Sequence, residues 1–533
     1  MDACRLPVTD RIARMTRQTL LLALVLVYAA GFRLLVIDRP FYDDVEGHGA
    51  FFGVLARNYL RFEWARTHGV PILTAGQGPD AAIVFYPDHP PLVPLMIAAS
   101  YRTFGIGDWQ TRLPTAIATI AAVAVLYLLV ARFGSRRAAI IAAALFAATP
   151  MTLYFGGQPE VVGMPLGLFI LLSTLGYLHF HEHPGYRTSV PLIAAFTLAG
   201  LSDWPAFIIV PVFLVHFLAT QPRREWRWIL PFAGTACALF AAMFIYIALA
   251  THAPWYWMVP LFLKHSTSHA DAPFTLREWL ATAAVYNRAR HTAPLLLAAG
   301  LWLIGRAPRV RLQQPGATIA RILVAWGILH VLIGRHGVYE HEWWWWPLTP
   351  GLAVSAALAI DAILGAVERR RSARDASAGA ALVVTCFALW TGFATFRELY
   401  PNRRTDAFTT VELGRAIQAA APNPNDVVLF AGGDVSPQVW FYGDRLLRLN
   451  VWSVDDFERR LFDDTAEITY GYAQPCKSPG AGLVFPRIWD DDFGELRAYL
   501  QQRYPLVSLP AALADKFEVF DLRRISARSA RRR

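Results

Sequence analysis

Apolar runs long enough to enter a membrane recur along most of this chain and constrain its architecture more than any other feature. About 20 mostly apolar residues cross a bilayer as a helix, and fewer suffice where neighbouring helices shield a segment. Of the 533 residues 55% are hydrophobic and only 17% are charged, too few charges to cover a soluble chain of this size. The sequence therefore predicts a polytopic α-helical membrane protein with about eleven spans. The expected spans are residues 19–37, 113–130, 138–153, 163–178, 190–200, 206–219, 228–250, 293–304, 322–333, 345–367 and 380–395.

Basic residues alternate between the two sides of these expected spans. Lys and Arg gather in every second connection, as the positive-inside rule expects of cytoplasmic loops, whereas the connections 154–161 and 202–205 contain neither. This alternation predicts a multi-pass protein of the plasma (inner) membrane with a cytoplasmic N-terminus. It also explains the net charge of +10, so the lipid bilayer rather than nucleic acid is the expected partner.

A long polar segment, residues 38–112, follows the first span and is expected on the extracytoplasmic side. Within it, residues 49–61 repeat apolar side chains at helical spacing. Residues 92–104 are apolar but too short for a typical span, and prolines stand at their start. Both stretches are predicted to be interfacial helices, with the apolar face of the first resting on the membrane surface.

The chain changes character after residue 402. Residues 403–522 read as a small soluble α/β domain, expected on the extracytoplasmic side. The Gly-Gly-Asp sequence at 432–434 follows an expected strand but lacks a nucleotide-binding pattern, so an ordinary turn is favoured over a nucleotide loop. Residues 523–533 are rich in Arg and Ser and are expected to form a disordered basic tail near anionic lipid. Strands are expected at 427–431, 439–442, 446–451, 482–486 and 517–522, and helices at 455–462 and 493–504.

Three carboxylates lie close together at the start of the first loop. Asp43, Asp44 and Glu46 fall within four positions, and His48 follows them. One interpretation is a set of solvated loop residues. The other is a general base that takes a proton from an acceptor hydroxyl while a second carboxylate orients that hydroxyl. Partial desolvation at a membrane surface raises carboxylate basicity, which suits this second interpretation.

Other extracytoplasmic segments carry candidate substrate-binding residues. Asp88 and His89 precede a double proline that itself fixes only a turn. Glu160 starts a span, where it is either a favourable partner of the helix dipole or a second active-site acid.

Basic and aromatic residues combine in two further segments. Arg335, His336 and His341 precede the run of tryptophans at 343–346, which indicates either an interfacial belt or an aromatic-walled site for a lipid phosphate. In the segment 251–292, Lys264, with His265 and Arg277, is a further candidate phosphate ligand.

No residue pattern indicates a cofactor. The four cysteines lack metal-ligand spacing, and the Glu342 region lacks the second histidine of a zinc-protease helix. The chemistry inferred below requires no cofactor; a divalent metal is compatible with it but is not indicated.

The ordered set of motifs resembles the GT-C superfamily of integral-membrane glycosyltransferases, specifically the protein O-mannosyltransferase and lipid A aminoarabinose transferase branch (glycosyltransferase family 39-like). The resemblance covers roughly residues 19–395 and makes 1–402 the expected glycosyltransferase domain. Its parts are the acidic motif after the first span, ARNYLRF (56–62), YPDHPPL (86–92), FGIGDWQTRLP (104–114), GGQPE (156–160), SDWP (202–205) and HEWWWWPLTP (341–350).

The resemblance implies an inverting transfer from a polyprenyl-phosphate-linked sugar on the extracytoplasmic side, with basic residues on the lipid phosphate. It also implies a first-loop aspartate as general base. The family's Asp-Glu pair falls at His48 and Gly49 here, with the acids upstream. Asp44 is therefore the preferred base and Glu46 the next, with His48 able to share the role.

Two other classes of function compete with this prediction. A transporter or flippase places charges within its spans, whereas this chain keeps nearly all of its charges in loops. A non-catalytic envelope-assembly scaffold would use the α/β domain to bind a partner. The expected function is a membrane hexosyl- or pentosyltransferase acting on an envelope lipid, glycan or protein.

Overall fold

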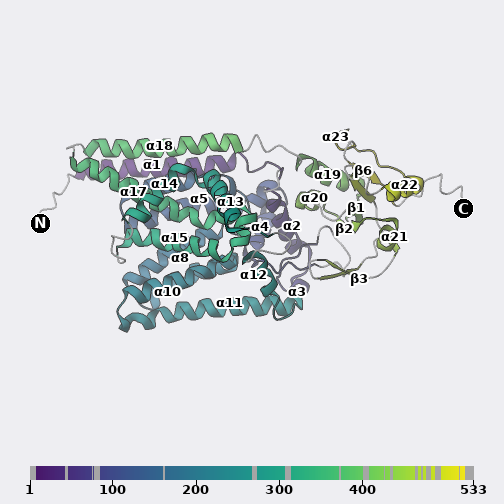
Figure 1. The fold of residues 1–533 in the computed structure, drawn as a ribbon, viewed down its shortest axis with the longest axis horizontal. Helices are drawn as coiled ribbons and strands as arrows, with labels where there is room; N and C mark the ends of the chain where they lie inside the picture. The colour runs from purple at the N-terminus through teal and green to yellow at the C-terminus, as the bar shows by residue number, and fades with distance from the viewer. Residues whose placement is uncertain are drawn as a thin grey trace. The chain divides into compact units, whose positions relative to one another are not determined.

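A computed structural model gives the fold of this protein (Figure 1). Helices form most of the chain between residues 8 and 399, and strands occur only after residue 426 in the part that the structure describes. That part comprises residues 8–42, 46–74, 76, 84–159, 162–266, 273–306, 314–370, 374–399, 407–424, 427–431, 436–462, 466–469, 472–475, 482–486, 494–509, 511–514 and 517–522.

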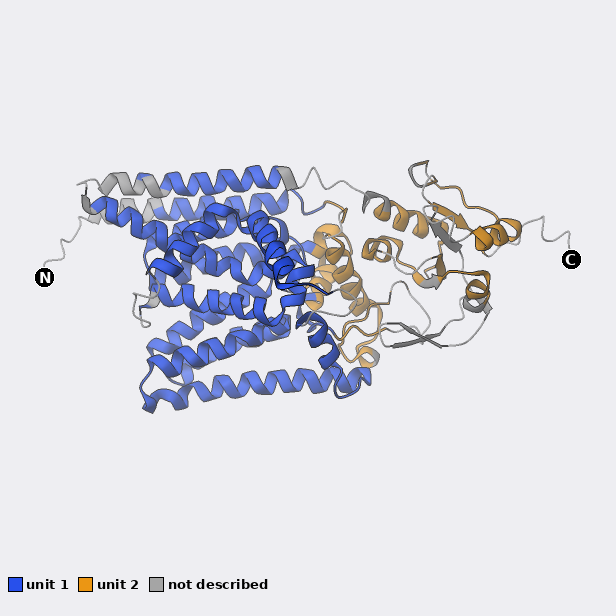
Figure 2. Cartoon of the chain, viewed as in Figure 1, with its two compact units in different colours: residues 1–38, 88–93, 112–400 blue, residues 39–87, 94–111, 401–533 orange. Residues whose placement is uncertain are grey.

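The chain forms two compact units, each made of separate stretches of sequence (Figure 2). Unit 1 consists of Met1–Asp38, Asp88–Val93 and Arg112–Tyr400. Unit 2 consists of Arg39–Pro87, Pro94–Thr111 and Pro401–Arg533. Most of the first loop thus shares a unit with the C-terminal residues, whereas Asp88–Val93 belongs to the helical unit.

The described residues of unit 1 form helices joined by turns and irregular connections, and each of the eleven expected spans overlaps one of these helices. Its helices are α1 (Val8–Leu34), most of α5 (Asp108–Phe133), α6 (Arg136–Ala148), α7 (Pro150–Phe155), α8 (Leu166–Glu182), α9 (Tyr186–Ser202), η2 (Trp204–Ile208), α10 (Ile209–Thr220), η3 (Arg223–Ile229), α11 (Leu230–Thr251), α12 (Met258–Ser266), α13 (Leu276–His291), α14 (Ala293–Gly300), η4 (Leu301–Arg306), α15 (Pro315–Ile333), α16 (Arg335–Glu340), η6 (Glu342–Leu348), α17 (Thr349–Arg370) and α18 (Arg374–Leu399).

Four helical segments are both long and apolar enough to cross a membrane, counted over the described residues. Shorter apolar helices accompany them, so the count of eleven spans stays a prediction. Helix breaks explain part of the difference between the eleven expected spans and the four long segments, because prolines interrupt apolar runs, as at Pro150 between α6 and α7. The four long segments are Asp108–Phe133, Arg223–Thr251, Gly316–Ile333 and Glu342–Glu368.

Small residues let the helices of unit 1 approach closely. Helix α6 is mostly alanine and isoleucine beyond its first turn, is buried along most of its length, and packs against α1, α17 and α18. Its N-terminus is capped by Ser135, whose hydroxyl accepts from the Ala138 amide. Asp361 of α17 accepts hydrogen bonds from Ser135 at 2.9 Å and from Arg137 at 2.5 Å, which ties the two helices together.

Unit 2 combines first-loop helices with a small sheet. Strands β2, β1, β5 and β6 are adjacent in that order; β1 is parallel to β2 and β5, and β6 is antiparallel to β5. Leu429, Phe457, Leu500 and Phe520 belong to its buried core. The elements are α2 (Gly47–Arg61), α3 (Trp64–Thr67), most of α4 (Leu92–Phe104), α19 (Ala407–Ala420), β1 (Val427–Ala431), α20 (Pro437–Gly443), β2 (Leu446–Val451), α21 (Val454–Phe462), β3 (Ala466–Thr469), β4 (Tyr472–Pro475), β5 (Gly482–Pro486), α22 (Gly494–Arg503), α23 (Ala511–Ala514) and β6 (Phe517–Phe520).

The expected strand at 439–442 is wrong, because these residues lie in helix α20. Val439, Trp440 and Phe441 favour strands by local propensity. Pro437 instead occupies the first helical turn, where its fixed φ suits a helix. Burial of the aromatic side chains, with packing of α20 against α2 and α19, then outweighs the local preference. The turn expected at 432–434 and the tail 523–533 lie outside the described residues.

The first-loop stretch 49–61 is a helix, as the sequence predicts, and it extends to Gly47 as α2. The environment of its apolar face differs from the expected one, because Phe52, Leu55 and most of their neighbours are buried. Protein rather than lipid therefore covers much of the apolar face of α2.

Candidate active site

An aspartate–histidine pair joins the Asp88–Pro90 turn to the end of helix α9. His89 Nδ1 and Asp203 Oδ1 share a hydrogen bond of 2.8 Å, and the Asp203 carboxylate is 1% exposed. Asp203 also caps η2 by accepting from the Trp204 amide at 2.8 Å. A carboxylate that accepts from one imidazole nitrogen fixes the orientation of the ring.

A second contact fixes the same turn. The Trp204 indole donates to the Asp88 carbonyl at 2.7 Å, and Trp326 of α15 donates to the Pro205 carbonyl at 3.0 Å. The turn is thus attached to η2, and η2 is attached to the helical bundle. This rigid support suits residues that must hold a substrate in one position.

The Asp88 side chain lies in a partly buried, positively charged setting. Burial raises the pKa of its carboxyl, and the nearby charges of His89 and Lys264 act in the opposite direction. A carboxyl of this kind is more basic than an exposed aspartate and is held near cations that could neutralise an anion.

We predict that Asp88→Asn raises the melting temperature at pH 7. The folded state binds the Asp88 proton more tightly than the unfolded chain, so the ionised carboxylate opposes folding above the folded-state pKa. This penalty vanishes as pH falls below the ordinary value of 3.8, so the gain should shrink toward pH 4. Thermal unfolding of both proteins at pH 7 and pH 4.5 tests this; a variant that melts no higher at pH 7 contradicts it.

Helices α12 and α16 pack together and bring more imidazoles to this region. The His265 ring lies 4.9 Å from that of Trp344, and His341 stacks on Trp343 at 4.5 Å. Burial, together with the nearby Lys264, His89, His341 and His336, lowers the pKa of His265 to about 4. His265 is therefore neutral at pH 7, whereas Lys264 places a positive charge beside it.

The Glu340 carboxylate lies beside two of these imidazoles. His336 Nε2 lies 3.0 Å from one Glu340 oxygen, and His341 Nε2 lies 3.8 Å from the other. The cluster of Lys264, His89, His265, His336 and His341, with Asp88, Asp203 and Glu340, is called the basic cluster below.

Tryptophans form part of its wall. Two glycines leave room for Trp344: a Cβ on Gly334 would come within 2.9 Å of the indole, and one on Gly337 would come closer still. Trp345 and Trp346 are 6% and 0% exposed, so protein surrounds them rather than a lipid interface. The choice between an interfacial belt and an aromatic-walled phosphate site stays a prediction.

A buried ion pair fixes the segment η6, which carries these tryptophans. Arg290 of α13 donates to both Glu342 oxygens, at 2.8 and 2.5 Å, and its guanidinium lies over the rings of Tyr154 and Phe155. Bidentate geometry of this kind restricts both side chains. The His341–Trp344 wall therefore rests on a rigid base.

The structure brings together five of the residues expected to bind substrate. Asp88, His89, Lys264, His336 and His341 all belong to the basic cluster. The Arg335 side chain is exposed, and its carbonyl accepts from the Trp279 indole at 2.8 Å.

The remaining candidates lie in unit 2 or outside the described residues. Asp43, Asp44 and Glu160 lie outside them. Glu46 and His48 lie at the start of α2. Glu46 is fully buried; one of its oxygens accepts from the Tyr42 amide at 2.9 Å and lies 3.8 Å from the Arg39 guanidinium.

Asp203 received no role from the sequence and is the main residue that sequence reasoning missed. The sequence feature that could have indicated Asp203 is its place in SDWP, where an acid at a helix end precedes a proline. The His89 pairing spans 114 residues, so no local pattern indicates it. Within the described ranges, no group of three His, Cys, Asp or Glu side chains is arranged to hold a metal ion.

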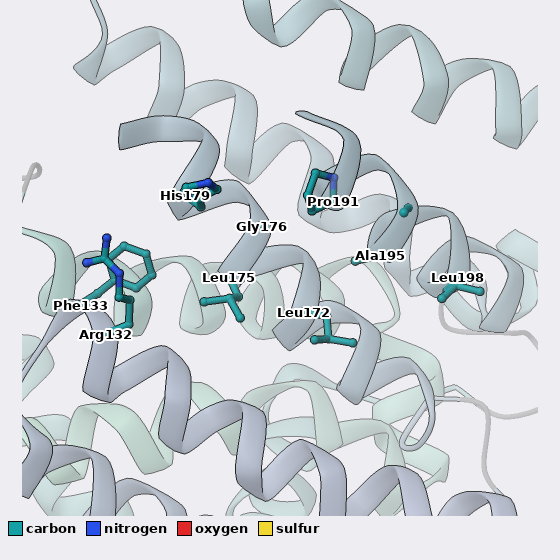
Figure 3. A pocket seen from close by; sticks show the side chains of 10 residues that line it. Arg132, Phe133, Leu172, Leu175, Gly176, His179, Pro191, Ala195 and Leu198 are labelled. Atoms are coloured by element: carbon teal, nitrogen blue, oxygen red, sulfur yellow. The ribbon is translucent and has the colours of Figure 1, made fainter. Parts of the chain in front are cut away.

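A separate groove opens among α5, α8 and α9 (Figure 3). Its volume is about 530 Å³, and Leu172, Leu175 and Leu198 are among the largely apolar side chains that line it. Arg132 at its edge pairs with Glu182 at 3.0 Å. None of the candidate site residues lines this groove, so it is no part of the basic cluster.

Comparison with known proteins places this site within a recognised fold. Residues 88–255, which include Asp88, His89 and Asp203, match the dolichyl-phosphate-mannose-protein mannosyltransferase family. A Bacillus subtilis (strain 168) protein with the provisional name mannosyltransferase YkcB is 31% identical over 143 residues, which are 26% of this chain and 19% of that protein. The match thus spans about a fifth of the relative's length.

Solved structures match over nearly the whole chain. ArnT from Cupriavidus metallidurans bound to undecaprenyl phosphate has a TM-score of 0.66 at 15% identity, covering 96% of this chain and 98% of that one. The Archaeoglobus fulgidus oligosaccharyltransferase in its apo form has a TM-score of 0.56 at 11% identity, covering 92% and 73%. At such identities the likeness shows a shared fold. The resemblance to GT-C glycosyltransferases of the mannosyltransferase and aminoarabinose transferase branch is confirmed.

Proposed function

We propose that this protein is a membrane glycosyltransferase that moves a sugar from a polyprenyl-phosphate-linked donor to a hydroxyl of an envelope lipid, glycan or protein. The observation that carries the proposal is the basic cluster, where Lys264 and the Asp203-oriented His89 meet beside an aromatic wall. The family match over 88–255 and the fold of an enzyme solved with undecaprenyl phosphate support the same assignment. The reaction takes place on the extracytoplasmic side, and the donated sugar is a hexose or a pentose.

The basic cluster suits the leaving group of this reaction. The acceptor oxygen forms a bond to the anomeric carbon while the bond from that carbon to the donor phosphate oxygen breaks, and polyprenyl phosphate leaves with the electron pair. Lys264 and His89 offset the charge that grows on this phosphate. One in-line displacement inverts the anomeric centre, and the cluster's rigid support keeps the reacting atoms aligned.

A first-loop carboxylate accepts the proton of the acceptor hydroxyl. We assign this role to Asp44. Glu46, which is buried and already accepts a backbone hydrogen bond, orders the start of α2, and His48 lies beside it. Asp88, with its raised pKa, lies at the phosphate rather than at the acceptor in this assignment.

Sugar transfer by the purified protein in lipid vesicles tests the proposal directly. Polyprenyl-phosphate donors carrying different hexoses and pentoses are each supplied with extracted envelope lipids, glycans and proteins, and product is followed by mass spectrometry. Transfer from at least one donor is expected, with inverted anomeric configuration. Failure with every donor would favour the scaffold, and donor flipping without transfer would favour the transporter.

We predict that Lys264→Met raises the donor KM about tenfold with a smaller effect on kcat. One charge-assisted hydrogen bond to phosphate is worth on the order of 1–2 kcal/mol once solvent screening is allowed for. Arg288→Met removes an exposed cation of α13 and is the matched control. Equal donor KM in the Lys264 variant and the control would remove Lys264 from the phosphate site.

A further inference from the structure

Helix α20 of the C-terminal region holds the first loop on both sides of residues 43–45. Before them, the Phe41 amide donates to the Tyr442 hydroxyl at 2.8 Å, and that hydroxyl donates to Asp108 at 2.5 Å. After them, Gly47 lies against Gln438: a Cβ on this glycine would approach the Gln438 amide to 3.2 Å. Residues of α20 thus fix the chain where it enters and where it leaves the acidic stretch.

An arginine of α2 completes the C-terminal end of α20. Arg57 is 3% exposed and donates to the Phe441 and Trp440 carbonyls at 2.9 and 3.2 Å. The Phe441 carbonyl is among those near a helix C-terminus that lack an intrahelical partner, and the Trp440 carbonyl also accepts from the Asp444 amide at 3.2 Å. A buried cation at this position also interacts favourably with the helix dipole.

Asp444, the residue after α20, binds two arginines of α2. Its carboxylate lies 2.9 Å from Arg57 and accepts a bidentate pair of hydrogen bonds from Arg61, one of them at 2.6 Å. Burial, partly offset by Asp444, lowers the pKa of Arg57 to about 10, so the cation persists at pH 7. Breaking this contact leaves a buried charge without its partner, which is costly.

Helices α2 and α20 are in close contact. A Cβ on Gly53 of α2 would come within 2.6 Å of the Phe441 ring. Two helices in such contact have one register, so the position of α20 determines that of Glu46 and His48 at the N-terminal end of α2.

We infer that α20 and Asp444 are a positioning element for the acidic start of α2. Asp444 acts through α2 and touches no substrate. The inference rests on the proposed function, and it gives the C-terminal region a role in catalysis: it sets the position of Glu46 and of the N-terminal end of α2.

Two measurements on the full-length protein in vesicles test this inference. In Asp444→Ala, hydrogen exchange of residues 47–61 should accelerate at least tenfold while α15 stays protected. Sugar transfer should lose about tenfold in kcat with donor KM within twofold, and Asp444→Glu should recover part of the loss. Tyr442→Phe, which removes a single hydroxyl, is the milder variant and should show smaller shifts in the same direction.

Glu518→Gln is the matched control, because Glu518 accepts a bidentate pair from Arg497 at 2.9 Å within the C-terminal part of unit 2. Unchanged exchange in α2, or equal loss of kcat in the control, overturns the inference. The exchange measurement needs no sugar donor, so it judges the positioning role even if the wild-type protein transfers no sugar. A wild-type protein that transfers no sugar would count against the proposed function but not against the positioning role.

Discussion

Asp44→Asn is expected to lower kcat for sugar transfer by about 10²–10⁴-fold, the usual contribution of a positioned general base. The amide keeps the size of the carboxylate but cannot accept the acceptor hydroxyl's proton. Donor binding depends on the basic cluster and should change little. Initial rates over a range of donor concentrations separate the two parameters.

Glu46→Gln and Asp38→Asn complete this experiment. Asp38 is an exposed acid a few residues upstream, and its variant should match the wild type. A wild-type kcat in Asp44→Asn together with a large loss in Glu46→Gln would transfer the base to Glu46. Wild-type kcat in both would show that neither acid is the base.

Asp203→Asn is expected to lower kcat/KM by about a hundredfold. The carboxylate holds the His89 ring through Nδ1 at 2.8 Å, and in the proposed function this ring binds the donor phosphate as an imidazolium. Asn retains the shape but loses the charge, so the imidazolium is less stable and the ring can adopt the other tautomer. Loss of one preorganised donor to a developing anion typically costs about 10²-fold or more.

The pH dependence separates this role from simple loss of folding. In the variant His89 should lose its proton at lower pH, so the alkaline limb of the kcat/KM profile should move to lower pH. Asp361→Asn also removes a carboxylate of unit 1, one that pairs with Arg137 away from the basic cluster, and should leave the profile in place. An Asp203 variant with a lower rate and an unmoved profile would assign Asp203 a structural role only.

Local pattern predicted the helical elements well, because apolar run length is a strong signal. The expected runs overlap helices, and the stretch 49–61 is helical as expected. The strand predicted at 439–442 was wrong. Its aromatic and β-branched residues favour a strand locally, and packing of helix α20 with α2 and α19 reverses that preference. The number of spans is harder to predict, since prolines and short helices interrupt the apolar runs.

The site was predictable in its residue types and only partly in its pairings. Asp88 and His89 stood out beside a double proline, and Lys264, His336 and His341 as basic residues in expected extracytoplasmic segments; the structure brings the five together. The partner of His89 did not stand out, because Asp203 lies 114 residues away. Burial of Glu46 was equally hidden, since its contacts with Tyr42 and Arg39 depend on how the chain folds back at the start of α2.

The pairing of α2 with α20 also has a consequence for biosynthesis. Arg57 and Phe441 are 384 positions apart, so the ribosome must make nearly all of the intervening helices before the two can meet. At about 5–20 residues per second this interval is roughly 20 to 80 s. During that time the glycines, the apolar side chains and the two arginines of α2 lack their contacts with α20. A chain truncated before residue 437 therefore presents an unpaired α2, an expected target for chaperones and proteases of the compartment in which the first loop emerges.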